Sequence, residues 1–296
     1  MSKKSSAHTH GQHEHSHEHA HGHHHHEHGP EHYQEHCRHQ AHCHGEAHEP
    51  RLTKGASVLT LRANSGVSGD MMLGGLAALA GLDDQTLSGL TAELGLPTLK
   101  NGVRLEERSV NAISGVGCKI ELPHEHAHRT LADIEKIIGS STMPDEAKEL
   151  SAKAFRLLAE AEGAVHGKAA SEVSFHEVGA LDSILDTCLA CRIFTILKPD
   201  HFICSPLPMA DGVINCAHGL VHSPAPAVLR LLEGVPICGF SGKGETVTPT
   251  ALSLLKALGA NFGPWPRMTV RKSVISYGDK IFEGAPNGAL WILGEA

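Results

Sequence analysis

The chain has 296 residues, a formal net charge of −8 with histidine neutral, and only 4% aromatic residues. A mildly acidic chain with few aromatic side chains and no basic stripe is poorly suited to nucleic acid, so we expect no such partner. The N-terminus has no apolar leader, and no apolar run approaches the ~20 residues that span a bilayer. We therefore expect a cytoplasmic protein, without a membrane partner, whose ligand is small or metallic.

The first 57 residues form a histidine-rich segment. Eighteen of the first 48 residues are histidine and almost none are aliphatic, so we expect a disordered tail over 1–57. Neutral imidazole suits Ni, Cu and Zn, and the alternation of His with other residues places many rings within reach of one ion. A solvating tail or an expression tag is the alternative, but the longest unbroken run is only His23–His26. The candidate metal ligands of the tail are His13, His15, His17, His19, His21, His23, His24, His25 and His26.

The folded domain is expected over residues 58–296, where apolar runs alternate with Gly and Pro. Its first expected elements are a strand at 58–62, helices at 71–80 and 83–94, and strands at 103–110 and 116–122 joined by a turn at 111–115. The glycine turn 65–70 lies between the first strand and the first helix, where free N–H groups can hold a phosphate. A tight turn in which Ser68 or Asp70 caps the helix is the favoured alternative.

The middle of the domain combines a second histidine cluster with three expected helices, at 131–138, 144–166 and 180–197. The third helix is apolar on most faces, so we expect it to be buried. We interpret its Cys188 and Cys191 as core thiols rather than as half of a metal site, and we expect no disulfides in the chain. The histidine cluster adds three candidate metal ligands, His124, His126 and His128.

Reactive side chains gather just before that buried helix. His176 and Glu177 are adjacent, and Asp182 and Asp186 are four residues apart, which puts both carboxylates on one helical face. Such a set can hold a metal or move protons. Alternatively, the aspartates serve the helix dipole and His176 is structural, and composition does not separate the two hypotheses. The candidate catalytic residues are His176, Glu177 and Asp182.

The last part of the domain is expected to contain a strand at 201–206, a helix ending at 233, a helix that opens at Thr248-Pro249, and strands at 268–274 and 290–293. His218 and His222 lie in an expected loop, and Thr248 is expected to cap its helix. Helices and strands do not follow the regular strand–helix–strand order of an all-parallel sheet. The expected fold class is therefore mixed α/β (α+β), a mixed sheet packed with helices.

Together these stretches resemble the LarC family, the nickel-insertion proteins of nickel-pincer cofactor synthesis. The resemblance covers about residues 58–293. It rests on seven ordered motifs: Ser65–Met71, His128-Arg129, Phe175–Ala180 with Asp182, Pro206-Leu207-Pro208, His218-Gly219, Pro224–Ala227 and Thr248-Pro249-Thr250.

The resemblance implies a nickel chelatase of the lyase class, a CTP-dependent cyclometallase that inserts nickel into pyridinium-3,5-bisthiocarboxylic acid mononucleotide. On this hypothesis the histidine clusters supply the metal, and His176 or Glu177 accepts the proton lost from the ring carbon. The resemblance also implies a set of ligand-binding residues, which are Ser65, Gly66, Ser68, Gly69, Asp70, His218, Thr248 and Thr250.

The sequence departs from the family in three places, with Arg62, Ala251 and Val221-His222 standing where relatives carry Asp, Gly and Leu-Pro. The family's C-terminal domain, to which CTP binding is assigned, would follow the last strand. We therefore expect CTP, with Mg or Mn, to act through a separate domain or partner chain. A non-catalytic nickel or zinc store or metallochaperone is the alternative function, and a homo-oligomer is compatible with the sequence.

Overall fold

The computed structural model of the chain describes residues 52–96, 102–121, 128–175, 180–216 and 219–296. The chain divides into two units, Met1–Gly45 and Glu46–Ala296, and all described residues belong to the second. The candidate ligands His13 to His26 of the predicted tail lie outside the described residues, whereas its expected end at residue 57 is wrong, because Ser57 already belongs to the first strand and Ala56 is buried. Within the described ranges, no helix combines the length and the apolar character needed to cross a membrane.

A seven-stranded mixed sheet lies at the centre of the second unit, in the order β11-β6-β1-β13-β12-β3-β2. Its strands are β1 Ser57–Arg62, β2 Val103–Val110, β3 Ile113–Ile120, β6 His201–Cys204, β11 Asn261–Phe262, β12 Thr269–Ser276 and β13 Ala289–Glu295. Strand β6 is parallel to β1 and to β11, whereas β13 runs antiparallel to both β1 and β12. All residues of β1 after the first are buried, as expected for a central strand covered on both faces. The predicted mixed sheet is confirmed.

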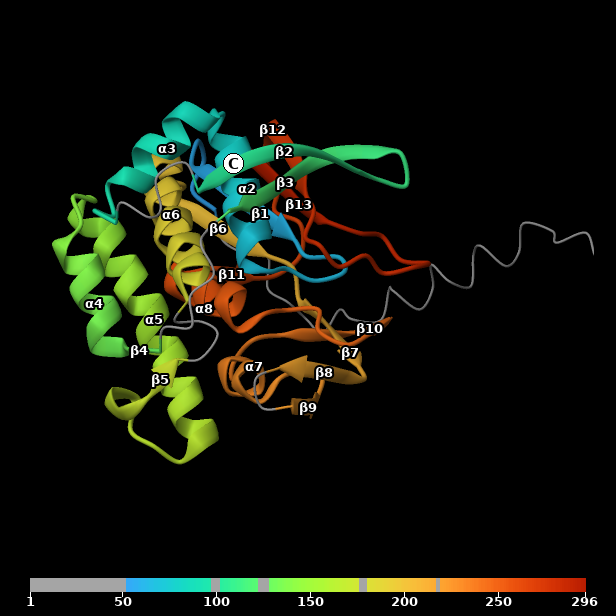
Figure 1. The fold of residues 1–296 in the computed structure, drawn as a ribbon. Helices are drawn as coiled ribbons and strands as arrows, with labels where there is room; N and C mark the ends of the chain where they lie inside the picture. The colour runs from blue at the N-terminus through green and yellow to red at the C-terminus, as the bar shows by residue number, and fades with distance from the viewer. Residues whose placement is uncertain (1–51, 97–101, 122–127, 176–179, 217–218) are drawn as a thin grey trace, which may run out of the picture. The chain divides into compact units, whose positions relative to one another are not determined.

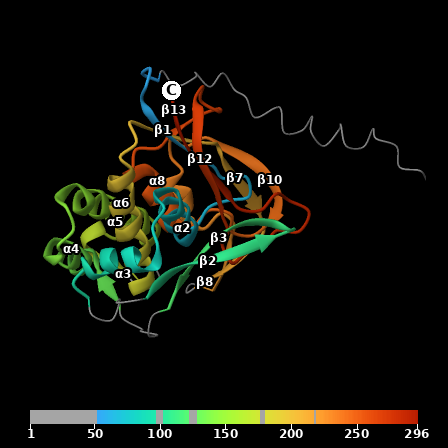
Figure 2. The same cartoon turned by 90° about the horizontal axis from the view of Figure 1, so that it is seen from above.

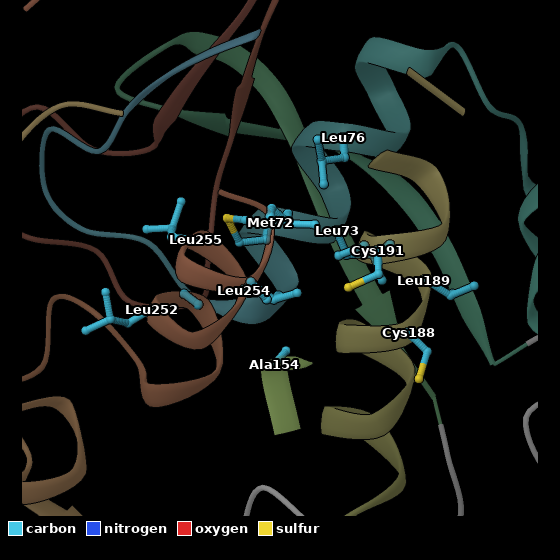
Figure 3. Packing of buried hydrophobic residues seen from close by; sticks show 14 of the residues in the cluster. Met72, Leu73, Leu76, Ala154, Cys188, Leu189, Cys191, Leu252, Leu254 and Leu255 are labelled. Carbon is cyan, nitrogen blue, oxygen red and sulfur yellow. The ribbon is translucent and has the colours of Figure 1, made fainter. Parts of the chain in front are cut away.

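Helices pack on this sheet and on one another (Figure 1). They are α2 Gly69–Ala80, α3 Asp84–Ala92, α4 Leu131–Ser140, α5 Asp145–His166, α6 Leu181–Leu197, α7 Pro226–Leu231 and α8 Pro249–Ala257. Helix α2 contacts β3, β12 and β13 on one side and α6 and α8 on the other, and α5 contacts α4, α6, α7 and α8. Apolar side chains of α2, α5, α6 and α8 meet in the shared core, as Figure 3 shows. The predicted burial of α6 is confirmed, and its Cys188 and Cys191 are fully buried and free.

An aromatic series joins α6 to the sheet. Trp291 of β13 stacks on Phe202 of β6 with ring centroids 6.4 Å apart, and Phe202 lies 5.7 Å from Phe194 of α6. The buried Trp291 satisfies its indole N–H by donating to the Ser276 hydroxyl at 2.9 Å. These contacts fix α6, and with it the carboxylates of its first turns, relative to the strands.

Three small strand pairs flank the main sheet. They are β7 Leu207–Asp211 with β10 Ile237–Lys243, β8 Val213–Cys216 with β9 Gly219–His222, and β4 Arg129–Thr130 with β5 Ser174–Phe175. Strands β7 to β10 lie together with α7 in Figure 1. The expectation that His222 lies in a loop is wrong, because it pairs with Val213 as the last residue of β9.

The β2–β3 hairpin differs from its prediction in the length of its turn. Val110 pairs directly with Ile113, so only Asn111 and Ala112 form the turn, and both have positive φ, 52° and 61°. A two-residue turn of this kind matches the twist of the flanking strands, which is why pairing continues through Ser114 and Gly115. The tip of the hairpin points away from α4, α5 and α6 in both Figure 1 and Figure 2.

Candidate functional site

A cavity of about 440 Å³ lies where the first turns of α6, α7 and α8 meet the last turn of α5 and the β8–β9 hairpin. Its wall comes from segments far apart in sequence: Glu162, Val165, His166, Ser174, Phe175, Asp182, Ser183, Ile214, Asn215, Cys216, Val221, Ala225, Pro226, Ala227, Glu245, Thr248, Pro249 and Thr250. The positive ends of three helix dipoles therefore lie at one hollow, together with both apolar and carboxylate side chains. This mixture is typical of a small-molecule site.

Three of the sequence-predicted site residues, Asp182, Thr248 and Thr250, are brought together in this wall. Asp182 is exposed in the first turn of α6, where its carboxylate accepts a hydrogen bond from the Ser183 backbone N–H at 2.7 Å. His176 and Glu177 lie outside the described residues, but Phe175, which precedes them, lines the cavity. Their predicted role stays a prediction, as does that of His218, which also lies outside the described ranges.

The charge of the cavity wall is predominantly negative. Its described lining includes the carboxylates Glu162, Asp182 and Glu245 and the imidazole of His166, with no Lys or Arg among these residues. His166 Nε2 lies 3.5 Å from Glu162 Oε2, an ion pair only when the ring is protonated. Lys280 lies behind Glu245 and donates to the Glu245 backbone oxygen at 2.9 Å. A wall of this kind favours a cationic ligand group.

Thr248 has the capping role that the sequence predicts. Its Oγ1 accepts from the Ala251 backbone N–H at 3.3 Å, and Pro249 occupies the first helical position of α8. Because the cap uses the hydroxyl only as an acceptor, the hydroxyl hydrogen remains able to donate to a ligand in the cavity.

The glycine turn Ser65–Asp70 supports this wall without lining the cavity. Val67 donates its N–H to the Thr246 oxygen at 2.9 Å, and Thr248 donates to the Val67 oxygen at 3.2 Å. The approach is close at Gly66, which has φ 123°, and a Cβ there would lie 1.8 Å from the Thr246 oxygen. Ser65 is buried at the start of the turn. The turn thus fixes the segment that carries Thr248 into the cavity wall.

Ser68 stands at the N-cap of α2, but its side chain makes no capping hydrogen bond. Its hydroxyl donates instead to the Asp70 carboxylate, two residues on in the first helical turn. Burial raises the pKa of Asp70, although this hydrogen bond and a backbone hydrogen bond from Met71 oppose the shift. The expectation that Ser68 or Asp70 caps α2 is therefore met only in part: Ser68 occupies the N-cap position without a side-chain capping hydrogen bond, whereas the Asp70 carboxylate accepts from the Met71 backbone N–H in the first turn.

Behind the cavity wall, α2 and α6 approach at Gly69. A Cβ on Gly69 would lie 2.8 Å from Asp186 Oδ2 and 3.1 Å from Thr250 Cγ2. Asp186 keeps some exposed surface as a residue, but its Oδ1 is buried and has no hydrogen-bond partner in the part of the chain that the structure describes. Burial raises the pKa of Asp186 well above its ordinary value, and the nearby Asp70 and Asp182 raise it further. Burial, together with the nearby Asp186 and Asp70, also raises the pKa of the Cys118 thiol on β3, which therefore stays neutral.

The remaining predicted ligands and departures lie away from the cavity lining. His128 is exposed beside β4, whereas His124 and His126 lie outside the described residues. Arg62 is buried at the end of β1, donates to the Gly263 oxygen at 2.8 Å, and lies 4.6 Å from the centre of the Trp265 ring. No group of three or more His, Cys, Asp or Glu side chains within the described ranges is arranged to hold a metal ion.

Glu162, His166 and Glu245 are cavity residues that sequence reasoning missed. Glu162 and His166 belong to the last turns of α5, where polar residues resemble an ordinary solvated helix face. Glu245 lies in a short loop after β10. The four-residue spacing of Glu162 and His166 on α5 was the one available signal. It indicates a site only in combination with α7 and α8, which pack against α5 in the structure.

Comparison with known proteins agrees with the motifs. The family model described as "Nickel insertion protein" matches residues 59–295. A "Putative nickel insertion protein" of Syntrophotalea carbinolica is 38% identical over 242 residues, covering 81% of this chain and 60% of the relative.

Two further relatives are named "Pyridinium-3,5-bisthiocarboxylic acid mononucleotide nickel insertion protein". That of Staphylococcus epidermidis is 35% identical, covering 76% of this chain and 56% of the relative, and that of Desulfitobacterium hafniense is 39% identical, covering 72% and 52%. The chain thus spans between half and about three fifths of the length of these relatives. No solved structure matches it significantly. The predicted resemblance is confirmed by the family match over nearly the whole described domain, and the chain belongs to the nickel insertion protein (LarC) family.

Proposed function

We propose that this chain inserts nickel into pyridinium-3,5-bisthiocarboxylic acid mononucleotide, or supplies the metal-handling half of an assembly that does so. The observation that carries the proposal is the cavity in which Asp182, Thr248 and Thr250 meet. Its volume of about 440 Å³ suits a mononucleotide-sized ligand. The substrate named for the relatives has a cationic ring and an anionic phosphate, and the cavity offers groups for both.

The two ends of such a ligand would lie against different parts of the wall. The carboxylates of Glu162, Asp182 and Glu245 favour the pyridinium ring. The first turn of α8 favours the phosphate, because its free N–H groups and the helix dipole attract anions. The Thr248 and Thr250 hydroxyls can add hydrogen bonds to the phosphate oxygens.

Nickel insertion also requires a proton acceptor. Each carbon–nickel bond that replaces a ring carbon–hydrogen bond releases one proton, and the thiocarboxylate sulfurs suit nickel as soft ligands. We propose His176 or Glu177 as the acceptor, with the Asp182 side chain beside it at the cavity wall. Of the ligand-binding residues that the resemblance implies, we retain Thr248, Thr250 and His218 as proposed ligand contacts, and we propose that Ser65, Gly66, Ser68, Gly69 and Asp70 act by supporting the cavity wall.

We further propose that CTP, with Mg or Mn, acts through a separate domain or chain, which would make the activity that of a lyase-class, CTP-dependent cyclometallase. This proposal rests on the resemblance alone. The cytoplasmic location and a homo-oligomeric state likewise stay predictions.

A store or metallochaperone is the second candidate function. It is favoured by the concentration of histidine in the first 48 residues, beside a described domain with no preformed group of three metal ligands. Such a protein would bind nickel or zinc through the tail without altering a substrate.

The decisive experiment supplies the purified chain with precursor, nickel and CTP, with and without a CTP-binding partner chain, and looks for nickelated product by mass spectrometry. Asp182→Asn should lower the insertion rate about 100-fold, because it removes a wall carboxylate. Asp145→Asn is the matched control, since Asp145 is exposed in the first turn of α5. His176→Ala and Glu177→Gln distinguish the two proton acceptors. Absence of product in every condition would leave the storage function.

A further inference from the structure

Three carboxylates form a series that runs from the cavity wall into the protein. Asp182 lines the cavity, and Asp186 lies one helical turn further along α6. Asp70 belongs to the first turn of α2, the helix that approaches Asp186 at Gly69. Thr250, which lines the cavity, approaches Gly69 as Asp186 does. Asp186 therefore lies directly behind the cavity wall.

Among the described residues, the surroundings of Asp186 provide no compensation for a negative charge. Its Oδ1 is buried without a hydrogen-bond partner among them, and the described charged groups that act on it, Asp70 from α2 and Asp182 from α6, are both acidic. The titratable group facing it from β3 is the neutral Cys118 thiol. On the α8 side the neighbour is the uncharged Thr250. A buried carboxylate in such a place is unfavourable unless a cation or a proton neutralises it.

A proton fits the described residues better than a metal ion, because no group of three ligating side chains is arranged around this point in the described ranges. Asp70 has compensation of its own, from the Ser68 hydroxyl and from its position in the first turn of α2. Asp182 is exposed. Of the three carboxylates, Asp186 is therefore the one whose neutralisation by a proton removes the most unfavourable electrostatic free energy.

We propose that Asp186 holds a proton at neutral pH and is a positioning residue for nickel insertion, its neutral carboxyl adding no negative charge between Asp182 and Asp70. The inference rests on the proposed function. If Asp186 ionised, a further negative charge would lie one helical turn from Asp182 and would repel its carboxyl group from its place in the cavity wall. Insertion should therefore slow as the pH rises through the range in which Asp186 loses its proton.

The activity test uses Asp186→Asn, which has the shape of the neutral acid and cannot ionise. We expect the variant to insert nickel within about threefold of the rate of the unmodified chain, in contrast to the roughly 100-fold loss for Asp182→Asn, and to lose the decline in rate at alkaline pH. A loss as large as that of Asp182→Asn would overturn the proposal, because it would mean that Asp186 acts as a charged group.

A second test on the full chain does not depend on any activity. Because burial raises the folded-state pKa of Asp186, the folded chain holds its proton to higher pH than the unfolded chain does. Its stability should fall as pH rises from the ordinary carboxyl pKa of about 4 through the raised value. Asp186→Asn should remove this fall in melting temperature, and Asp145→Asn should retain it.

Identical pH profiles of melting temperature for the unmodified chain and Asp186→Asn would overturn the proposal. If the unmodified chain inserts no nickel but the expected difference in melting profiles is found, the protonated carboxyl stands and the proposed function fails.

Discussion

At the scale of single residues, Gly69 decides how closely two helices approach behind the cavity. A methyl group there would press on Asp186 Oδ2 and on the Thr250 methyl. Gly69→Ala should therefore lower the free energy of unfolding by about 1–3 kcal/mol, as overpacking does, even though Ala is the better helix former. Urea denaturation measures the change.

Gly89 provides the matched control for this substitution. It is exposed in α3 and has no atom within 4 Å of an added Cβ, so Gly89→Ala should stabilise the chain by about 0.5–1 kcal/mol. Equal effects of the two substitutions would contradict the packing assigned to Gly69.

Sequence reasoning found the cavity residues whose local pattern carries a physical meaning. The spacing of Asp182 and Asp186 predicted one helical face, and Thr248 before Pro249 predicted a capped helix start. Asp182 and Thr248 line one cavity because α5 packs against α6, α7 and α8, and no local pattern encodes this packing. For the same reason the sequence did not indicate that Asp186 would lie beside Asp70.

At the scale of elements, the long helices and the main strands were predictable and the short strands were not. Helix α5 combines an apolar stripe with Pro144 at its start, and α6 is apolar throughout its middle. Strands β8 and β9 have only four residues each, and none of these residues is buried, so they produce little signal.

The start of α8 combines a stability role with a position at the cavity, and substitution can separate the two. Thr248→Ala removes the acceptor for the Ala251 N–H and should cost about 1 kcal/mol, seen as a lower melting temperature. Thr248→Ser keeps the hydroxyl and should retain nearly all of the stability. If the serine variant is as unstable as the alanine variant, the methyl packing of Thr248 matters more than its cap.

At the scale of the whole molecule, the histidine-rich segment and the domain are predicted to divide the work of collecting and using metal. Deleting residues 1–51, which leaves β1 intact, should sharply lower the number of Ni(II) ions bound per chain, because it removes eighteen of the 26 histidines. The loss should be smaller below pH ~6.5, where imidazole is protonated and binds metal weakly. Isothermal titration calorimetry of both chains makes the comparison, and unchanged Ni(II) uptake would contradict the delivery hypothesis.

The paired backbone hydrogen bonds between Val67 and the Thr246–Thr248 segment have a consequence for local opening. They join the turn after the first strand to the start of α8, two segments separated by most of the domain's sequence. Neither amide can reach solvent unless both segments part. The amide hydrogens of Val67 and Thr248 should therefore exchange with deuterium together, as one cooperative unit, and more slowly than those of the exposed β2–β3 tip.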